Sequence, residues 1–355
     1  MKKTVAIDAR LVGGSSTGDS TYWTGLLHGF AEIAPEDSLL FISNTGKPPE
    51  IPWSSKWRWL VVPSRSSRWW SLVAFPLAAR RARADVVHVQ YNLSPLVRRG
   101  GVTTVHDVSF FIGPEWFGTK DRLLLQRFVP ASVRRSAGVI AVSETCRQEI
   151  ERFIPAARGK TSVTPEAAAP WIEPIDRAEA RARISSLYGT AEPYAFSLGT
   201  SWARKNQALA IETVERAPTA PRLYLGGKQA PGDSDTPRVR RLGYVNQGDL
   251  SALYSAAEVH ILPSLHEGFG LTVLEAFTCG CPVLCGSGGA LPEVAGNAAT
   301  IVPSYEPQAW ADALQTMLSS NLDELRERGR HRAAEFSWAA TARLTRQVYE
   351  AVVNP

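Results

Sequence analysis

Two carboxylates, Glu267 and Glu275, lie eight residues apart in a glycine-containing segment. This spacing could bind the two sugar rings that flank a diphosphate. The apolar residues 259–264 predict a buried strand, and residues 271–277 predict a helix. A helix start has unpaired amides and the positive end of the helix dipole, so it favours a phosphate. At about 1.5 Å per residue, Glu275 would lie roughly 6 to 8 Å further along the axis, within reach of a ribose.

The same two residues have a plainer interpretation, in which Glu267 favours the helix dipole and Glu275 is a solvated helix residue. The two glycines between them favour binding, because glycine lets a backbone approach a ligand closely. We therefore expect Glu267 to face the hydroxyls of a transferred sugar and Glu275 those of a ribose. The residues expected to contact the phosphate are Gly268, Phe269, Gly270 and Leu271.

Five segments of the second half carry motifs of a known family. They are residues 242–245, 249–254, 263–270, 280–283 and 291–294, and they resemble the retaining glycosyltransferases of family 4. The resemblance covers nearly the whole chain. It implies a GT-B fold, in which two Rossmann-like α/β domains with parallel sheets face each other across a cleft, and a last helix that crosses back to the first domain.

The length and the pattern of the chain agree with two domains. A chain of 355 residues is long for one core. Strand-like runs alternate with helical patterns throughout, which predicts parallel sheets covered by helices. The proline-containing segment 165–176 is the expected linker, and Ser337 is the expected N-cap of the last helix. We expect an acceptor-binding domain at 1–170 with the helix at 337–355, and a donor-binding domain at 171–336.

Two cations follow the predicted strand 194–198, at the strand end where parallel sheets bind ligands. Arg204 and Lys205 could bind a diphosphate there and stabilise the charge of a departing nucleotide, although an isolated pair of this kind is usually a solvated surface pair. The resemblance implies that Lys205 contacts the diphosphate. Thr200 stands where many relatives carry arginine, so Arg204 is expected to take that role. Asn206 is expected to cap the next helix.

Two segments of the first half also follow predicted strands. Residues 13–20, which include Gly18, are expected to form a phosphate-facing loop, although glycine-rich loops are mostly ordinary turns. Relatives frequently show Gly-x-Gly here, whereas this chain has Gly18-Asp19-Ser20. An acid beside a diphosphate is unfavourable, so Asp19 is expected to face the acceptor or solvent. His106, after the predicted strand 102–105, is either a structural histidine or, as the resemblance implies, a contact to the transferred sugar.

Tyr244 and Val245 belong to a segment that resembles the loop whose backbone holds the nucleotide base. Backbone contacts do not reveal the base from the sequence, so its identity stays open. The resemblance makes GDP-mannose the leading donor and UDP-glucose the alternative.

Residues 53–84 contain five tryptophans, seven lysines or arginines and no acid. Such a mixture suits an anionic membrane surface. The alternative is that the tryptophans are core residues and the cations are solvated. A nucleic-acid partner, which would need similar residues, is not expected. Positive charge gathers in the first half, because residues 1–170 hold 22 basic against 14 acidic residues, and the remainder 17 against 20.

The remaining features argue against other classes of protein. Residues 1–8 start like a signal peptide, but the apolar run is short and broken, so we expect a first strand there. We also expect a cytoplasmic protein, peripheral at most on the inner face of a membrane. Neither a disulfide framework nor a metal site is expected from the four cysteines, and the three that cluster in the second half are expected to be small packing residues beside the site. The four cysteines are Cys146, Cys279, Cys281 and Cys285.

We thus expect a retaining hexosyltransferase with a glycan or lipid-linked acceptor, serving cell-surface polysaccharide or glycolipid synthesis. No metal or other cofactor is required, because cations and a helix terminus can stabilise the leaving group. The alternatives are a UDP-glucose-type donor with a small-molecule acceptor, such as a free sugar or inorganic phosphate, and a non-catalytic sugar-nucleotide-binding protein. The residues expected to act in catalysis are Glu267, His106, Lys205 and Arg204.

Overall fold

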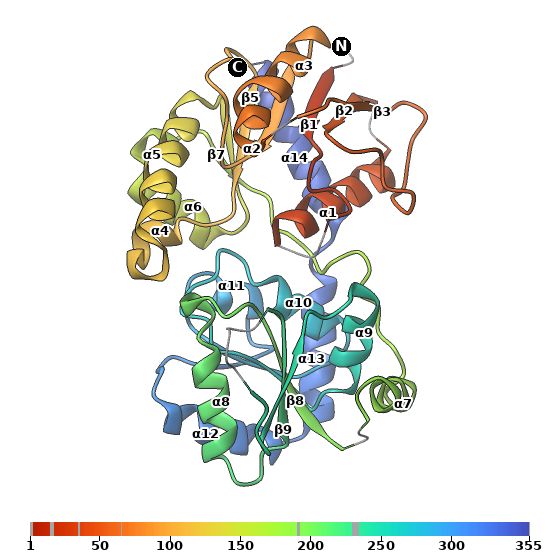
Figure 1. Cartoon of the computed structure of the whole chain (residues 1–355), viewed down its shortest axis with the longest axis vertical. Coiled ribbons are helices and arrows are strands. Elements are labelled where there is room, and N and C mark those ends of the chain that lie inside the picture. Colours follow the sequence, from red (N-terminus) through yellow and green to blue (C-terminus); the bar gives the residue numbers. More distant parts are fainter. Residues whose placement is uncertain are drawn as a thin grey trace. The chain divides into compact units, whose positions relative to one another are not determined.

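The computed structural model divides into two compact units, which we call the N-terminal and the C-terminal unit (Figure 1). The N-terminal unit comprises Met1–Ala167 and Ser337–Pro355, and the C-terminal unit comprises Ala168–Phe336. The division falls inside the segment 165–176. The structure describes residues 3–14, 18–34, 36–64, 66–189, 192–228 and 234–354.

The N-terminal unit is built on a seven-stranded sheet in which all neighbouring strands are parallel, in the order β3-β2-β1-β4-β5-β6-β7. Its central strands are mostly apolar and almost fully buried, as expected for strands covered on both faces. The strands are β1 (Thr4–Asp8), β2 (Ser38–Ser43), β3 (Arg58–Val61), β4 (Val86–Gln90), β5 (Gly101–Val105), β6 (Gly138–Ala141) and β7 (Thr161–Val163).

The last helix of the chain, α14 (Trp338–Val353), packs against α1 (Gly18–Ile33) and so belongs to the N-terminal unit. A Cβ atom on Gly25 of α1 would lie 2.0 Å from Cε2 of Trp338, so glycine is needed for this close approach. Ser337 caps α14, because its hydroxyl accepts a hydrogen bond from the amide of Ala340 at 3.2 Å. Both the return of the last helix and its cap are confirmed.

The other helices of this unit are short to medium in length. They are α2 (Ser67–Trp69), the π-helical turn η1 (Trp70–Ala74), α3 (Phe75–Arg81), α4 (Ser109–Ile112), the 3₁₀ turn η2 (Pro114–Trp116), α5 (Thr119–Arg135), α6 (Glu144–Phe153) and the 3₁₀ turn η3 (Pro155–Ala157). In Figure 1 the helices cover the sheet, which confirms the expected α/β class.

The C-terminal unit has a six-stranded parallel sheet in the order β10-β9-β8-β11-β12-β13. The strands are β8 (Tyr194–Leu198), β9 (Arg222–Gly226), β10 (Val239–Gly243), β11 (Val259–Leu262), β12 (Val283–Gly286) and β13 (Thr300–Val302). The helices are α7 (Arg177–Tyr188), the 3₁₀ turn η4 (Ala203–Lys205), α8 (Gln207–Arg216), α9 (Gln247–Ala256), α10 (Leu271–Thr278), α11 (Leu291–Ala295), α12 (Pro307–Leu318) and α13 (Leu322–Ala334).

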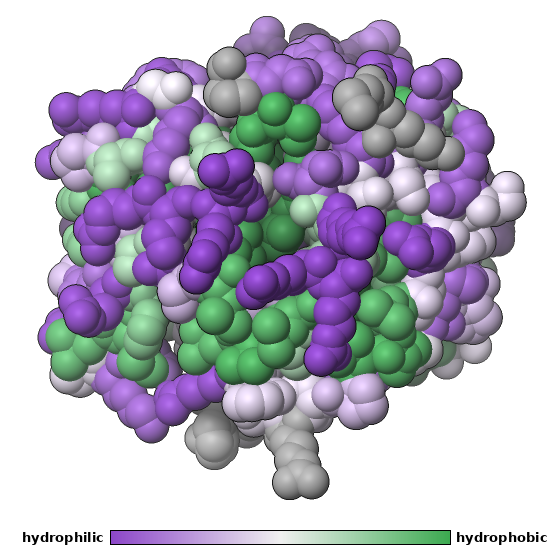
Figure 2. Space-filling view, turned by 90° about the horizontal axis from the view of Figure 1, so that it is seen from above, coloured by the Kyte–Doolittle hydropathy of each residue, from purple (hydrophilic) through white to green (hydrophobic). Residues whose placement is uncertain are grey.

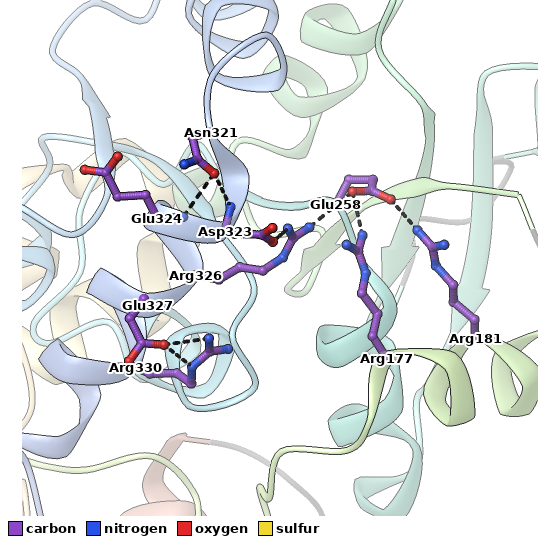
Figure 3. Close-up of polar contacts among 9 residues, drawn as sticks. All are labelled: Arg177, Arg181, Glu258, Asn321, Asp323, Glu324, Arg326, Glu327 and Arg330. Carbon is purple, nitrogen blue, oxygen red and sulfur yellow. Dashed lines mark hydrogen bonds and ion pairs between the residues drawn. The ribbon is translucent and has the colours of Figure 1, made fainter.

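Glu258 joins two helices of the C-terminal unit to the start of β11 (Figure 3). Its carboxylate lies 2.6 Å from both Arg177 and Arg181 of α7 and 3.3 Å from Arg326 of α13. This cluster lies at the amino end of β11. It therefore holds the scaffold at the sheet edge opposite to the carboxyl ends of the strands.

Among the described residues, no helix is long and apolar enough to cross a membrane. The four cysteines are buried and unpaired with one another. The first strand expected from residues 1–8 is β1.

Candidate functional site

The residues with the most distinctive chemistry in the C-terminal unit follow two neighbouring strands. Arg204 and Lys205 lie on the turn η4 after β8, and Glu267 lies on the loop after β11. Strands β8 and β11 are paired in parallel, so both segments emerge at the same edge of the sheet. Ligands of parallel sheets bind at this edge.

Lys205 and Arg204 both contact the carboxylate of Glu267. Lys205 Nζ donates to Oε1 at 2.6 Å, and Arg204 Nη1 donates to Oε2 at 3.1 Å. Burial alone would raise the pKa of Glu267, but the positive charges of Lys205 and Arg204 outweigh it and lower the pKa to about 2. Glu267 is therefore ionised at neutral pH and fixes both cations beside the start of α10.

The backbone at Glu267 is held by the loop before α11. Glu267 and Gly289 form a parallel bridge, and the amide of Ala290 donates to the carbonyl oxygen of Glu267 at 2.8 Å. A Cβ atom on Gly289 would lie only 2.2 Å from that oxygen. The position of the Glu267 carboxylate therefore depends on a close backbone contact that only glycine permits.

Helix α10 begins where the sequence predicts. Gly270 is its N-cap residue with φ of 107°, a conformation that strongly favours glycine, and Leu271 is the first helical residue. Phe269 is buried and packs edge-on against Phe336, with 5.8 Å between the ring centroids. The main chain from Gly268 to Leu271 therefore forms an anchored helix N-terminus next to Glu267.

Glu275 lies on α10 and is only 6% exposed, so the interpretation as a solvated helix residue is wrong. Tyr254 of α9 donates a hydrogen bond to its Oε2 at 3.1 Å. Burial raises the pKa of Glu275 to about 7, although the Tyr254 hydroxyl and the charge of Lys205 act in the opposite direction. At neutral pH this carboxyl group is therefore present in both protonation states.

Thr200 and Tyr244 lie at the same sheet edge, because each follows the carboxyl end of a strand, β8 and β10 respectively. Thr200 is exposed, and Tyr244 is 61% exposed, so its ring is accessible to a planar ligand. Val245 is buried and anchors this loop. The expectation for Asn206 is wrong in one respect: it holds the N-cap position of α8 but has φ of 48°, and its side chain makes no capping hydrogen bond.

In the N-terminal unit, His106 lies at the carboxyl end of β5 within a polar group. Its Nδ1 contacts Oε1 of Glu166 at 2.9 Å, and its Nε2 lies 2.9 Å from the side-chain amide of Gln90 and 4.0 Å from Oδ1 of Asp19. Burial lowers the pKa of His106, but the hydrogen bond and charge of Glu166, with the charges of Asp19 and Asp107, outweigh it, so the pKa is raised.

Gly18 is the first residue of α1. The side chain of Asp19 is 45% exposed, in keeping with the expected contact to solvent or acceptor. Residues 15–17 of the glycine-rich segment lie outside the described residues. The structure thus gathers Glu267, Arg204, Lys205 and the start of α10 in one unit, and His106 and Gly18 belong to the other.

In the parts of the chain that the structure describes, no three His, Cys, Asp or Glu side chains gather as a metal site.

Several residues around the expected site were missed in the sequence. Tyr254 reaches Glu275 from 21 residues away and Glu166 reaches His106 from 60 residues away, and no local pattern indicates either pair. Gly289, in contrast, could have been found, since a Gly-Gly pair just before a Leu-Pro-Glu helix start indicates a close backbone approach.

Two family descriptions match the chain. The model for "Glycosyl transferases group 1" matches residues 235–336, and that for "Glycosyltransferase Family 4" matches residues 31–167. The O-antigen chain mannosyltransferase B of Escherichia coli is 32% identical over 266 residues, which are 70% of this chain and 70% of that protein.

Two solved structures are similar over nearly the full length. Sucrose-phosphate synthase from Thermosynechococcus elongatus has a TM-score of 0.75 at 22% identity, with 98% of each chain covered. The Anabaena protein HepE, solved with UDP-glucose, has a TM-score of 0.71 at 16% identity, with 99% of this chain and 100% of that chain covered. At these identities the likeness shows the fold, which is the expected GT-B fold.

Proposed function

The chain belongs to the family 4, group 1 glycosyltransferases, and from this premise we propose that it transfers a hexose from a nucleoside-diphosphate sugar to a hydroxyl group with retention of the anomeric configuration. Membership of this family makes the chain a glycosyltransferase. The donor, the stereochemistry and the acceptor are our proposals, as are the roles of single residues and of the two units.

The observation that carries the proposal is the position of Glu267 between two cations and a helix N-terminus. A diphosphate would lie against Lys205, Arg204 and the amides at 269–271, and these groups would stabilise the charge that develops on the leaving nucleotide. The Glu267 carboxylate would then exchange its contacts with the cations for contacts with sugar hydroxyls. We assign Glu267 an orienting and charge-stabilising role, and name no protein nucleophile.

The remaining residues complete a binding site for the donor. Glu275, one to two turns into α10, would accept hydrogen bonds from the ribose, and the accessible ring of Tyr244 would lie near the base, with Val245 and Thr200 beside the nucleotide. His106 of the N-terminal unit would contact the transferred sugar. Under this proposal the C-terminal unit holds the donor and the N-terminal unit holds the acceptor.

For the sugar we propose mannose, carried by GDP. Support for mannose comes from the mannosyltransferase that aligns with 70% of this chain, and support for GDP comes from the family resemblance alone. A UDP-glucose donor is the alternative, because the neighbour HepE was solved with that compound. On the basis of the O-antigen chain mannosyltransferase and the family resemblance, we propose a glycan or lipid-linked acceptor and a role in cell-surface polysaccharide synthesis.

We further propose that the reaction needs no metal ion, since Lys205, Arg204 and the start of α10 already place positive charge where the leaving group departs. Turnover should then persist in excess chelator. Complete loss of turnover with EDTA, restored by Mg²⁺ or Mn²⁺, would contradict this.

We also propose that part of the segment 53–84 meets an anionic membrane. Trp57 and Trp70 are core residues, which agrees with the core interpretation for those two, but Trp69 and Leu72 are 55% and 46% exposed. Exposed arginines follow in α3, so residues 67–81 combine exposed apolar side chains with positive charge. We therefore propose these residues as the part that contacts the membrane. Figure 2 shows apolar patches crossed by hydrophilic side chains on the face seen from above. Arg65, another residue of the segment, lies outside the described residues.

The proposed function is tested by incubating the purified chain with a panel of nucleotide sugars. A donor that binds only the folded protein must raise its Tm, and release of nucleoside diphosphate in the presence of acceptor shows turnover. We expect the largest shift with GDP-mannose. Binding of a nucleotide sugar with no release under any acceptor would favour the non-catalytic alternative, and no shift with any donor would contradict the proposal.

A further inference from the structure

Glu166, which no sequence motif indicates, is the closest charged partner of His106 among the contacts described above. Glu166 follows β7 and is 3% exposed, and its Oε1 lies 2.9 Å from Nδ1 of His106. A buried carboxylate requires a hydrogen-bond donor or a positive charge beside it. Glu166 therefore accepts a hydrogen bond from Nδ1–H of His106.

The main chain on either side fixes Glu166 in this position. The amide of Thr164 donates to the carbonyl of Ala141 in β6 at 2.9 Å, and the carbonyl of Pro165 accepts from the hydroxyl of Thr341 in α14. The last helix of the chain thus holds the loop that carries Glu166. This explains how a residue outside regular structure can keep a buried carboxylate in place.

Gln90 determines whether the other ring nitrogen of His106, Nε2, carries a proton in the neutral ring. Its side-chain NH₂ group donates to the main-chain oxygen of Asp19 at 3.1 Å and lies 2.9 Å from Nε2 of His106. An NH₂ group can only donate, so Nε2 accepts when the ring is neutral, and the proton resides on Nδ1, facing Glu166. The structure thereby specifies the Nδ1–H tautomer.

Acidic groups dominate the charges around the ring. Glu166 faces Nδ1, the half-exposed Asp19 lies 4.0 Å from Nε2, and Asp107 is the next residue in the chain. The other titratable groups that face His106 are the rings of Tyr22 and Tyr91, the thiol of Cys146, which donates to the His106 carbonyl, and His88, whose pKa burial lowers to about 3.

We propose that Glu166 is a positioning residue of His106: it fixes the ring through Nδ1–H and stabilises the imidazolium, so that Nε2 becomes a charged hydrogen-bond donor to a sugar hydroxyl oxygen. On protonation the Gln90 amide releases Nε2, and the new N–H points to the side where Asp19 is exposed. This inference rests on the proposed function, since it assigns His106 a substrate oxygen. A carboxylate that accepts from one ring N–H is one of the ways in which proteins hold a histidine in a single tautomer.

The test combines a titration with kinetics. In the ligand-free protein, ¹⁵N NMR of labelled histidine should show His106 as the Nδ1–H tautomer when neutral and titrating above pH 6.5, its ordinary value. Glu166→Gln keeps an acceptor for Nδ1–H but removes the charge, and should lower that midpoint by about 1 pH unit or more. Glu144→Gln, on the surface of α6, should leave this midpoint unchanged.

The pH profile of kcat/KM should move together with the midpoint. In the wild type, activity should be lost as the pH rises through the pKa of His106. In Glu166→Gln, the same loss should occur at a correspondingly lower pH.

Three results would overturn the proposal. They are a wild-type midpoint at or below 6.5, the Nε2–H tautomer in the wild type, and a Glu166→Gln profile that does not move although the midpoint does. The first two are measured on the wild type without substrate, so they remain decisive even if Glu166→Gln does not fold. They also remain decisive if the chain transfers no sugar, a result that would count against the proposed function alone.

Discussion

The ammonium nitrogen of Lys205 lies 2.6 Å from a carboxylate oxygen of Glu267 at the carboxyl edge of the second sheet, where Glu267 is buried and Lys205 is partly exposed. The pair links two residues for which we propose different substrate contacts, the diphosphate and the sugar. In the ligand-free protein the Glu267 carboxylate is thus bonded to the Lys205 ammonium group that a diphosphate would require. When the donor binds, Lys205 should therefore exchange its contact with Glu267 for a contact with the diphosphate.

Lys205→Met should weaken donor binding by about 10- to 100-fold, because a hydrogen bond to a charged group contributes about 1.5 to 3 kcal/mol. Titration calorimetry with the nucleotide sugar measures this change. Lys120→Met, an exposed lysine on α5, is the matched control and should bind as the wild type does. Equal affinities for the Lys205 and Lys120 variants would remove Lys205 from the site.

Glu275 should make the stability of the protein depend on pH. Its pKa is raised from 4.5 to about 7 in the folded state, so its contribution to stability is fully present below about pH 4.5 and is lost as the pH rises through 7. Between these two pH values, the free energy of unfolding of the wild type should fall by up to about 3 kcal/mol relative to that of Glu275→Gln, at 1.36 kcal/mol per pKa unit. Urea unfolding at a series of pH values measures the difference. A constant difference between the two proteins would contradict the raised pKa.

The same titration should appear in donor binding. Ionised Glu275 is the better acceptor for ribose hydroxyls, so the affinity of the wild type should rise as the pH passes through 7. Glu275→Gln should bind more weakly and without this rise.

Gly270→Ala should disrupt the start of α10. At φ of 107° an alanine is strained, and its Cβ would lie 2.9 Å from Cδ2 of Leu291, so we expect a loss of about 1 to 3 kcal/mol in the free energy of unfolding together with weaker donor binding. Gly248→Ala is the control, because Gly248 lies inside α9 with its nearest neighbour 3.9 Å from a Cβ, and this change should stabilise the helix. If both variants behave alike, the conformation of Gly270 is not needed.

Reversal of charge in α3 should reduce binding to anionic vesicles. Arg80→Glu/Arg81→Glu replaces two exposed cations at the end of α3 by acids, and each cation near a membrane surface contributes about 1 kcal/mol. The matched double variant Arg216→Glu/Arg330→Glu changes two exposed arginines of the C-terminal unit and should bind as before. Sedimentation with phosphatidylserine vesicles compares the two, and equal binding would reject residues 67–81 as the membrane contact.

The sequence predicts the elements around Glu267 well, because the signals there are local. A short buried strand, two glycines and an apolar helix occur in direct succession, and the structure has β11, the Gly270 cap and α10 at these positions. Asn206 shows the limit of local reasoning: its position before α8 is as expected, but the residue has a left-handed conformation and its side chain makes no capping hydrogen bond.

Contacts between distant segments could not be predicted. The pairs Glu275 with Tyr254 and His106 with Glu166 depend on how strands and helices are ordered in the sheet, which no single segment encodes. Composition likewise does not show which tryptophans face the core. Trp69 and Trp70 are neighbours in one helical stretch and so point about 100° apart, and Trp70 is buried whereas Trp69 is exposed.

The central claim is tested most directly by measuring donor affinity and kcat together in Glu267→Gln, with Glu212→Gln on the surface of α8 as control. The substitution frees Lys205 and Arg204 for the diphosphate, so donor affinity should be unchanged or tighter, whereas kcat should fall by about 10²- to 10³-fold because the charge facing the sugar is lost. Wild-type turnover in Glu267→Gln, or loss of donor binding without any change in kcat, would contradict the account.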